Sequence, residues 1–134
     1  MTNIGILTNL DDIFITTLIE QIVKINNINF YLIICKNKNN KKKLNKIFKE
    51  RTGDFFNKGN SNLFATKIKL PTYFVNSHNS KYLYKIIEKN NINFLYNSST
   101  PNKLSKKTLG KVKGIINIHP GLLPHYRGCT CPEW

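Results

Sequence analysis

The chain has 134 residues, of which 40% are hydrophobic and 11% are aromatic, and its formal net charge is +14. This length and composition indicate one globular domain with a hydrophobic core and exclude a disordered chain. No apolar run reaches the roughly 18 to 20 residues that a membrane-spanning helix needs, and no basic stretch precedes an apolar block at the N-terminus. We therefore expect a cytoplasmic protein with no membrane partner.

The positive charge comes from 19 Lys and 2 Arg, and it accompanies 20 Asn and 18 Ile. Enrichment in Lys, Asn and Ile together is typical of coding sequence rich in A and T. Nucleic-acid interfaces are more often enriched in Arg as well, because a guanidinium group pairs with phosphates and base edges through two hydrogen bonds. We interpret the charge as a solvated basic surface. A nucleic-acid-binding protein stays as the alternative, and a steep salt dependence of binding would reveal it.

The three cysteines are Cys35, Cys129 and Cys131. An odd number of cysteines without a secretory signal indicates reduced thiols and not a disulfide framework. Cys129 and Cys131 form a C-x-C pair for which His125 is the one nearby ligand, and this falls short of the four ligands of a structural zinc site. We expect no metal.

The first third of the chain predicts a parallel strand–helix–strand unit. Residues 3–8 form a short apolar strand, and Asp11 or Asp12 can cap the helix that follows. The inward face of this helix should comprise Ile15, Leu18, Ile19, Ile22 and Ile25, with Asn26 and Asn27 ending it. Residues 30–35 are apolar throughout, which is typical of a strand covered on both faces.

The middle of the chain predicts a second set of alternating elements. Residues 36–51 indicate a lysine-rich amphipathic helix, and residues 53–67 a loop anchored by aromatic side chains. Residues 72–75 form a third strand, and Ser77 or Ser80 can cap the next helix. The buried face of that helix should hold Leu83, Ile86 and Ile87. His78, at the strand end, is interpreted either as an exposed turn residue or as a ligand contact.

Residues 92–96 predict a fourth strand, which runs into a polar loop over residues 97–101 that can offer hydroxyl and N–H groups to a ligand. Leu104 and Leu109 indicate a short helix, and Ile115, Ile116 and Ile118 a fifth, buried strand. Five strands alternating with helices predict an α/β domain with a mostly parallel sheet. Neither a G-x-G-x-x-G nor a G-x-x-x-x-G-K-[ST] motif occurs, so a dinucleotide or nucleoside triphosphate is not indicated.

Asn117 and His119 lie two residues apart at the end of the fifth strand, so their side chains should share a face. An imidazole titrates near physiological pH and can act as a general base, while an amide can donate to a developing oxyanion. Together they suit attack of a neutral amine on a carbonyl. The alternative is that His119 only holds the following loop by hydrogen bonding.

The segment Asn117-Ile-His-Pro-Gly-Leu-Leu-Pro-His-Tyr-Arg-Gly128 resembles the signature of the formyltransferases that use 10-formyltetrahydrofolate. This family includes methionyl-tRNA formyltransferase, glycinamide ribonucleotide formyltransferase and the sugar N-formyltransferases. The resemblance implies a Rossmann-like fold, with a mostly parallel open sheet and helices on both faces. It also implies that Asn117 and His119 are catalytic. The segment that lines the folate site would comprise Gly121, Leu122, Leu123 and Pro124, flanked by Asn97, Ser98, Ser99 and Thr100.

The acceptor implied by the resemblance is a primary amine. Residues 128–134 resemble formyltransferases of small amines, so we favour a nucleotide-linked amino sugar, with aminoacyl-tRNA as the alternative. The family's third catalytic residue, an aspartate well downstream of the histidine, has no match within residues 1–134. We therefore expect residues 1–134 to be a single formyltransferase-like domain that lacks its C-terminal part and is inactive alone. A degenerate folate-binding module is the remaining alternative.

Overall fold

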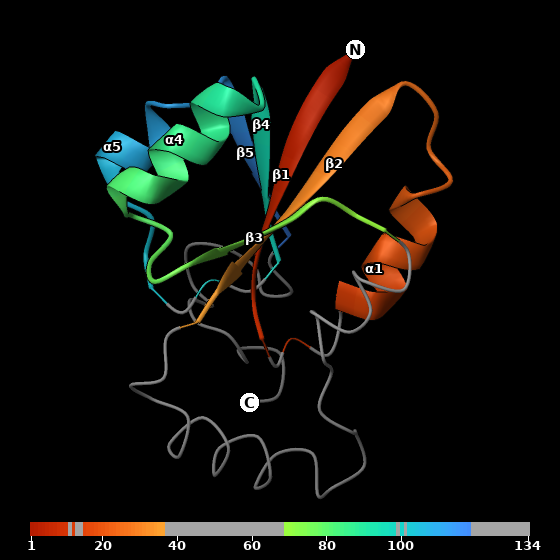
Figure 1. Ribbon diagram of the computed structural model, residues 1–134, viewed down its shortest axis with the longest axis horizontal. Coiled ribbons are helices and arrows are strands. Elements are labelled where there is room, and N and C mark those ends of the chain that lie inside the picture. The colour runs from red at the N-terminus through yellow and green to blue at the C-terminus, as the bar shows by residue number, and fades with distance from the viewer. Residues whose placement is uncertain (11, 13–14, 37–68, 99, 101, 119–134) are drawn as a thin grey trace, which may run out of the picture.

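The computed structural model describes residues 1–10, 12, 15–36, 69–98, 100 and 102–118. These residues form one five-stranded sheet with helices packed against it (Figure 1). The elements in chain order are β1 (Thr2–Asn9), α1 (Ile15–Ile22), β2 (Ile28–Cys35), β3 (Thr72–Val75), α4 (Lys81–Lys89), β4 (Phe94–Asn97), α5 (Lys106–Leu109) and β5 (Gly114–Asn117). The predicted helix over residues 36–51, apart from Lys36, and the predicted loop over residues 53–67 lie outside the described part of the chain.

The strand order β3-β2-β1-β4-β5 places the first strand in the centre of the sheet. All four strand pairs are parallel, so the carboxyl ends of all five strands lie along one edge. The chain moves outward from β1 to β3 and then returns to β4 on the other side of β1. In doubly wound sheets, ligands bind outside the carboxyl ends of the strands where the order reverses in this way. The predicted Rossmann-like α/β fold is confirmed, and the point of reversal lies between β1 and β4.

Successive side chains of a strand point to opposite faces of the sheet, and the buried strands are apolar on both faces. Helices therefore cover both faces of the sheet. On one face, Ile6, Leu32 and Ile34 pack with Ile15 and Ile19 of α1. The opposite face packs against α4 through a core cluster that includes Leu7, Ile33, Leu83, Ile86, Ile87 and Leu95. In Figure 1, α1 and the pair of α4 and α5 accordingly lie on opposite sides of the sheet.

Two local predictions are decided by one side-chain contact and one backbone angle. Ser80 and not Ser77 caps α4, since the Ser80 hydroxyl accepts a hydrogen bond from the backbone N–H of Leu83 at 3.2 Å. Asn27, which was predicted to end the first helical segment, adopts a left-handed φ of 68° just before β2. Asn tolerates this conformation better than most residues. The turn that follows α1 is thus built on Asn27.

Two predictions of burial are wrong. Helix α1 ends at Ile22, so Ile25 lies beyond its packed face and its side chain is 49% exposed. The fifth strand was expected to be buried, but Ile116 is 47% and Ile118 is 72% exposed. The physical reason is that β5 is the edge strand of the described sheet, with β4 as its one described neighbour. Ile115 still packs, partly buried, against the α4 side of the core.

Candidate active site

The polar residues predicted to form the site follow β4 and β5, which end side by side at the carboxyl edge of the sheet. Asn97 and Asn117 are the last residues of these strands, and Ser98 and Thr100 follow β4 directly. Ser99, His119, Gly121, Leu122, Leu123 and Pro124 lie outside the described part of the chain. The structure therefore places four of the ten predicted site residues, and the roles of all ten stay predictions.

Asn97 and Asn117 are brought into direct contact. They are register partners across β4 and β5, and Nδ2 of Asn97 donates a hydrogen bond to Oδ1 of Asn117 at 2.8 Å. Neighbouring parallel strands hold paired side chains on the same face at this spacing. With its oxygen engaged by Asn97, the exposed amide of Asn117 keeps its Nδ2 hydrogens as donors. An amide in this state has the chemistry that an oxyanion requires.

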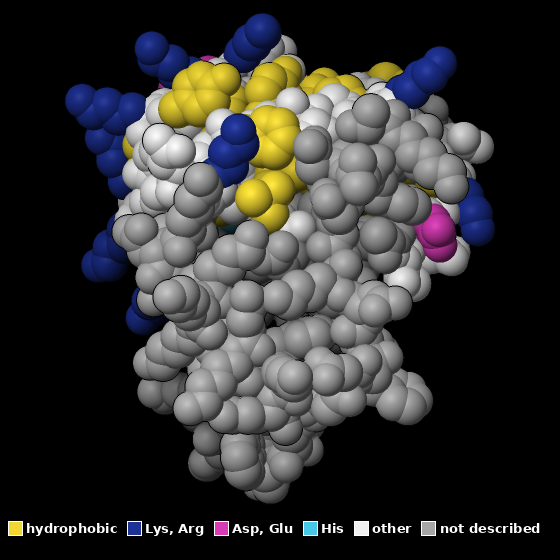
Figure 2. Space-filling view, turned by 60° about the horizontal axis from the view of Figure 1, so that its bottom comes forward, with side chains coloured by type: hydrophobic (Ala, Val, Ile, Leu, Met, Phe, Trp, Pro, Cys, Tyr) yellow, Lys and Arg dark blue, Asp and Glu magenta, His cyan; other side chains and the backbone are white. Residues whose placement is uncertain are grey.

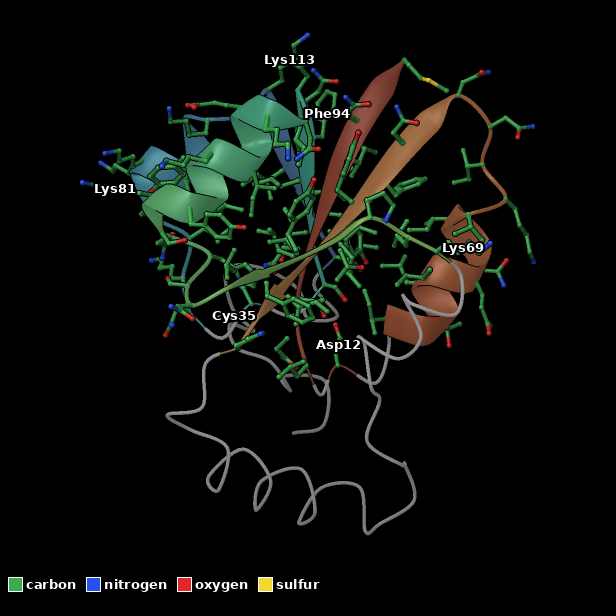
Figure 3. The ribbon with its side chains drawn as sticks, viewed as in Figure 1. Asp12, Cys35, Lys69, Lys81, Phe94 and Lys113 are labelled. Atoms are coloured by element: carbon green, nitrogen blue, oxygen red, sulfur yellow. The ribbon has the colours of Figure 1, made fainter. Side chains whose placement is uncertain are left out.

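A buried carboxylate lies at the point of reversal of the strand order, between β1 and β4. The side chain of Asp12 is 5% exposed, and its Oδ2 accepts hydrogen bonds from Thr8 Oγ1 and Ser98 Oγ, each at 2.7 Å. The backbone N–H of Ser98 also donates to the carbonyl of Leu7 at 3.0 Å. Asp12 thus ties the polar loop after β4 to the end of β1. Figure 3 shows Asp12 near the carboxyl ends of the strands, with Phe94 and Lys113 toward the opposite edge of the sheet.

Sequence reasoning did not predict this Asp12 cluster. It treated Asp12 as a helix cap and Ser98 as a ligand contact. The bond from Thr8 is a local contact with the end of β1, and the bond from Ser98 joins Asp12 to the residue that follows β4. The available signal was a hydroxyl at the end of the first strand followed four residues later by a carboxylate. The capping role of Asp12 and the folate-binding role of Ser98 stay predictions.

The expectation that His78 is an exposed turn histidine is wrong. Its side chain is 3% exposed, and Nε2 lies 3.1 Å from the carbonyl oxygen of Ile33 in β2. A carbonyl oxygen accepts, so Nε2 carries the hydrogen, and Nδ1 is shielded with no hydrogen-bond partner. Burial lowers the pKa of His78 below its ordinary value of 6.5, and the bond to Ile33 opposes this in part. The imidazole is therefore neutral, and its hydrogen bond joins the turn after β3 to β2.

Three other features bear on the predictions. Cys35 is a buried free thiol whose Sγ lies 3.4 Å from the carbonyl oxygen of Asn76. Within the described ranges, no group of three His, Cys, Asp or Glu side chains is arranged to hold a metal ion. None of the described helices is both long enough and apolar enough to cross a membrane.

Comparison with solved structures identifies enzymes with the same fold. Glycinamide ribonucleotide transformylase 1 from Symbiobacterium toebii superposes with a TM-score of 0.67 and 13% sequence identity, over 99% of this chain and 58% of that protein. Phosphoribosylglycinamide formyltransferase (purN) from Coxiella burnetii, in complex with CHES, superposes with a TM-score of 0.62 and 20% identity, over 95% of this chain and 55% of that protein. The chain thus has a formyltransferase fold and spans just over half of each enzyme's length.

At the level of sequence, no family model matches the chain, and no curated protein matches it either. Both similar structures share less than 25% sequence identity with this chain, so they establish its fold alone. The reaction has to be argued from the residues of the site.

Proposed function

We propose that this chain forms the greater part of a formyltransferase domain that moves a formyl group from 10-formyltetrahydrofolate to a primary amine. The observation that carries the proposal is the state of Asn117. It lies at the carboxyl edge of a formyltransferase fold, its amide oxygen is held by Asn97, and its exposed amide keeps hydrogen-bond donors. The motif from Asn117 to Gly128 supports the same reaction.

In this reaction, Asn117 donates an amide hydrogen to the formyl oxygen while negative charge develops there. His119 accepts the proton that the amine loses as its nitrogen bonds to the formyl carbon. The bond between the formyl carbon and N10 of the folate then breaks, and the departing nitrogen takes up the proton that His119 had accepted. The reaction consumes 10-formyltetrahydrofolate as the formyl donor, and neither an oxidant nor a metal enters its stoichiometry.

The residues around Asn117 fit a polar ligand that contains amide and carbonyl groups. At the same edge lie the amide of Asn97, the hydroxyl of Thr100 and the hydroxyl of Ser98, which donates to Asp12 and can still accept. Oδ1 of Asn97 is a shielded acceptor with no hydrogen-bond partner. Buried acceptors in this state are uncommon in folded proteins. We propose that the loop over residues 97–100 lies beside the folate, as the family resemblance implies, together with residues 121–124.

For the acceptor, we propose a nucleotide-linked amino sugar, on the basis of residues 128–134. Glycinamide ribonucleotide, the substrate class in the names of both similar enzymes, is a second small amine to be assayed.

One observation favours aminoacyl-tRNA as the alternative acceptor. Residues 81–113 hold eight Lys and one Glu, and their net charge of +7 is half of the total of +14. The lysine side chains are exposed, and in Figure 2 dark-blue side chains gather on the side of α4 and α5. These residues are Lys81, Lys85, Lys89, Lys103, Lys106, Lys107, Lys111 and Lys113. A surface of this charge attracts phosphate backbones and gives salt-dependent binding.

The test is an assay of formyl transfer with the three acceptors in parallel, using both the 134-residue chain and the longest product of the gene that encodes it. We expect the longer product to formylate the amino sugar and the 134-residue chain to be inactive, since it spans just over half of the similar enzymes. Robust turnover by the 134-residue chain would contradict the expectation that residues 1–134 are inactive alone. Transfer to aminoacyl-tRNA alone would replace the amino sugar by the alternative acceptor.

A further inference from the structure

The cross-strand hydrogen bond between Asn97 and Asn117 engages the oxygen end of the Asn117 amide. The two residues end neighbouring parallel strands in register, and Nδ2 of Asn97 lies 2.8 Å from Oδ1 of Asn117. A primary amide carries its oxygen and its NH₂ group on opposite sides of one carbon. When Asn97 holds the oxygen, the NH₂ group of Asn117 is on the other side and available to donate.

The orientation of this amide changes the sign of its effect on the reaction. With Nδ2 directed at the formyl oxygen, Asn117 stabilises developing negative charge. With the amide turned over, its oxygen would face the same negative charge and oppose it. A side-chain amide that is free to rotate samples both arrangements, and the active fraction falls accordingly.

The surroundings of Asn97 favour one of the two orientations of its amide. Its Oδ1 is shielded from solvent and has no hydrogen-bond partner, and the residue after it is tied to β1 through the bonds of Ser98 to Leu7 and Asp12. Turning both amides together would keep one hydrogen bond between them. It would also bring an NH₂ group with two donors into the shielded position, in place of one acceptor. Unpaired buried N–H groups are rarer than under-satisfied carbonyl oxygens, so the observed arrangement is the more stable one.

We propose that Asn97 is a positioning residue that acts through Asn117: it fixes the amide of Asn117 with the NH₂ group directed at the reacting carbonyl. This inference rests on the proposed formyl transfer. It replaces the direct folate contact of Asn97 and leaves that contact to the rest of the loop proposed above to lie beside the folate. A side chain on β4 would then set the orientation of the donor amide on β5.

The test compares the Asn97→Asp and Asn97→Ala variants of the longest gene product. Each substitution is also made in a protein that already carries Asn117→Ala. The carboxylate introduced by Asn97→Asp offers acceptors only, so it reverses the Asn117 amide, and kcat should fall by about 10²-fold, the usual effect of losing one oxyanion donor. Asn97→Ala leaves the amide free to rotate, so kcat should fall by only about twofold to tenfold. KM for both substrates should change by less than about threefold, because the proposed contact acts through kcat.

The Asn117→Ala background separates a loss of kcat that acts through Asn117 from a loss caused directly by the introduced carboxylate charge. If Asn97 acts through Asn117, neither substitution should lower kcat by more than about threefold further in that background. An equal loss in both backgrounds would overturn the proposal and indicate a charge effect. A rise in the KM for 10-formyltetrahydrofolate with unchanged kcat would overturn it as well and restore a folate-binding role. Asn76→Asp is the matched control, since Asn76 is exposed just after β3, at the far side of the same sheet edge.

A readout that does not need activity separates failure of this inference from failure of the proposed function. Nitrogen-15 NMR of the 134-residue chain follows the side-chain amides of Asn97 and Asn117. In the unsubstituted chain, an Nδ2 hydrogen of Asn97 should be protected from exchange, and Asn97→Asp should transfer protection to Asn117. Absence of this transfer overturns the positioning role. Transfer of protection in the 134-residue chain, without formylation of any acceptor by the longest gene product, would instead reject the proposed reaction and leave the amide pair as a structural contact.

Discussion

Replacing Asp12 by alanine tests whether its carboxylate joins β1 to the loop after β4. The side chain is 5% exposed and accepts hydrogen bonds from Thr8 and Ser98, each at 2.7 Å. Hydrogen bonds to a charged group contribute about 1.5–3 kcal/mol each. Removing a buried carboxylate also relieves part of its desolvation cost, so we expect a net loss of about 2–4 kcal/mol in the free energy of unfolding.

The assay is urea unfolding at pH 7, followed by circular dichroism, with Asp12→Asn and Glu20→Ala as companions. The amide oxygen introduced by Asp12→Asn can still accept, through weaker neutral hydrogen bonds, so this variant should lose about 1–2 kcal/mol. Glu20 is exposed on α1, and its removal should change stability by less than about 0.5 kcal/mol. An Asp12→Ala variant as stable as the Glu20→Ala variant would refute the reasoning, because the two hydroxyl contacts would then contribute nothing.

Two further predictions concern the turn and helix that follow β3. Ser80→Ala removes the acceptor for the backbone N–H of Leu83 and should cost about 1 kcal/mol in urea unfolding, whereas Ser80→Asn keeps the cap and should cost almost nothing. Equal losses for both would mean that the cap does not contribute. Because burial lowers the folded-state pKa of His78, the unfolded chain binds more protons just below pH 6.5, so stability should fall as pH drops from 6.5 toward that lowered pKa. His78→Gln should reduce this pH dependence between pH 7.5 and 5, and an unchanged dependence would show that His78 is not its source.

Much of the fold follows from local patterns that tertiary contacts do not override. The apolar runs of β1 and β2 are long and bounded by polar turns, and both strands were located to within about two residues at each end. Strand β3 begins and ends at the predicted residues, because Pro71 and Asn76 bound it.

The errors arise where burial depends on partners distant in sequence. Ile25 matched the helical spacing, but spacing alone does not show that α1 ends one turn earlier. The isoleucines of β5 are as apolar as those of β2, yet β5 lies at the edge of the described sheet and its side chains are more exposed. His78 was placed correctly after a strand, but its burial depends on the carbonyl of Ile33, 45 residues away.

The proximity of Asn97 to Asn117 was predictable from the sequence, whereas the contacts around them were predictable only in part. Parallel strands end at one edge, so the sequence places Asn97 beside Asn117 once the strand order is known. The direction of their hydrogen bond and the bond from Ser98 to Asp12 depend on tertiary contacts, because the first joins two strands and the second joins the segments that follow β4 and β1. No periodicity within either strand encodes them.

The most direct test of the central claim is the rate of formyl transfer from 10-formyltetrahydrofolate by the longest product of the gene, compared with its Asn117→Ala variant. We predict measurable transfer to the amino sugar and a loss of about 10²- to 10³-fold in kcat on removing the amide, with the unfolding midpoint nearly unchanged. Unchanged kcat in the variant, or no transfer by the parent protein to the amino sugar, glycinamide ribonucleotide or aminoacyl-tRNA, would contradict the account.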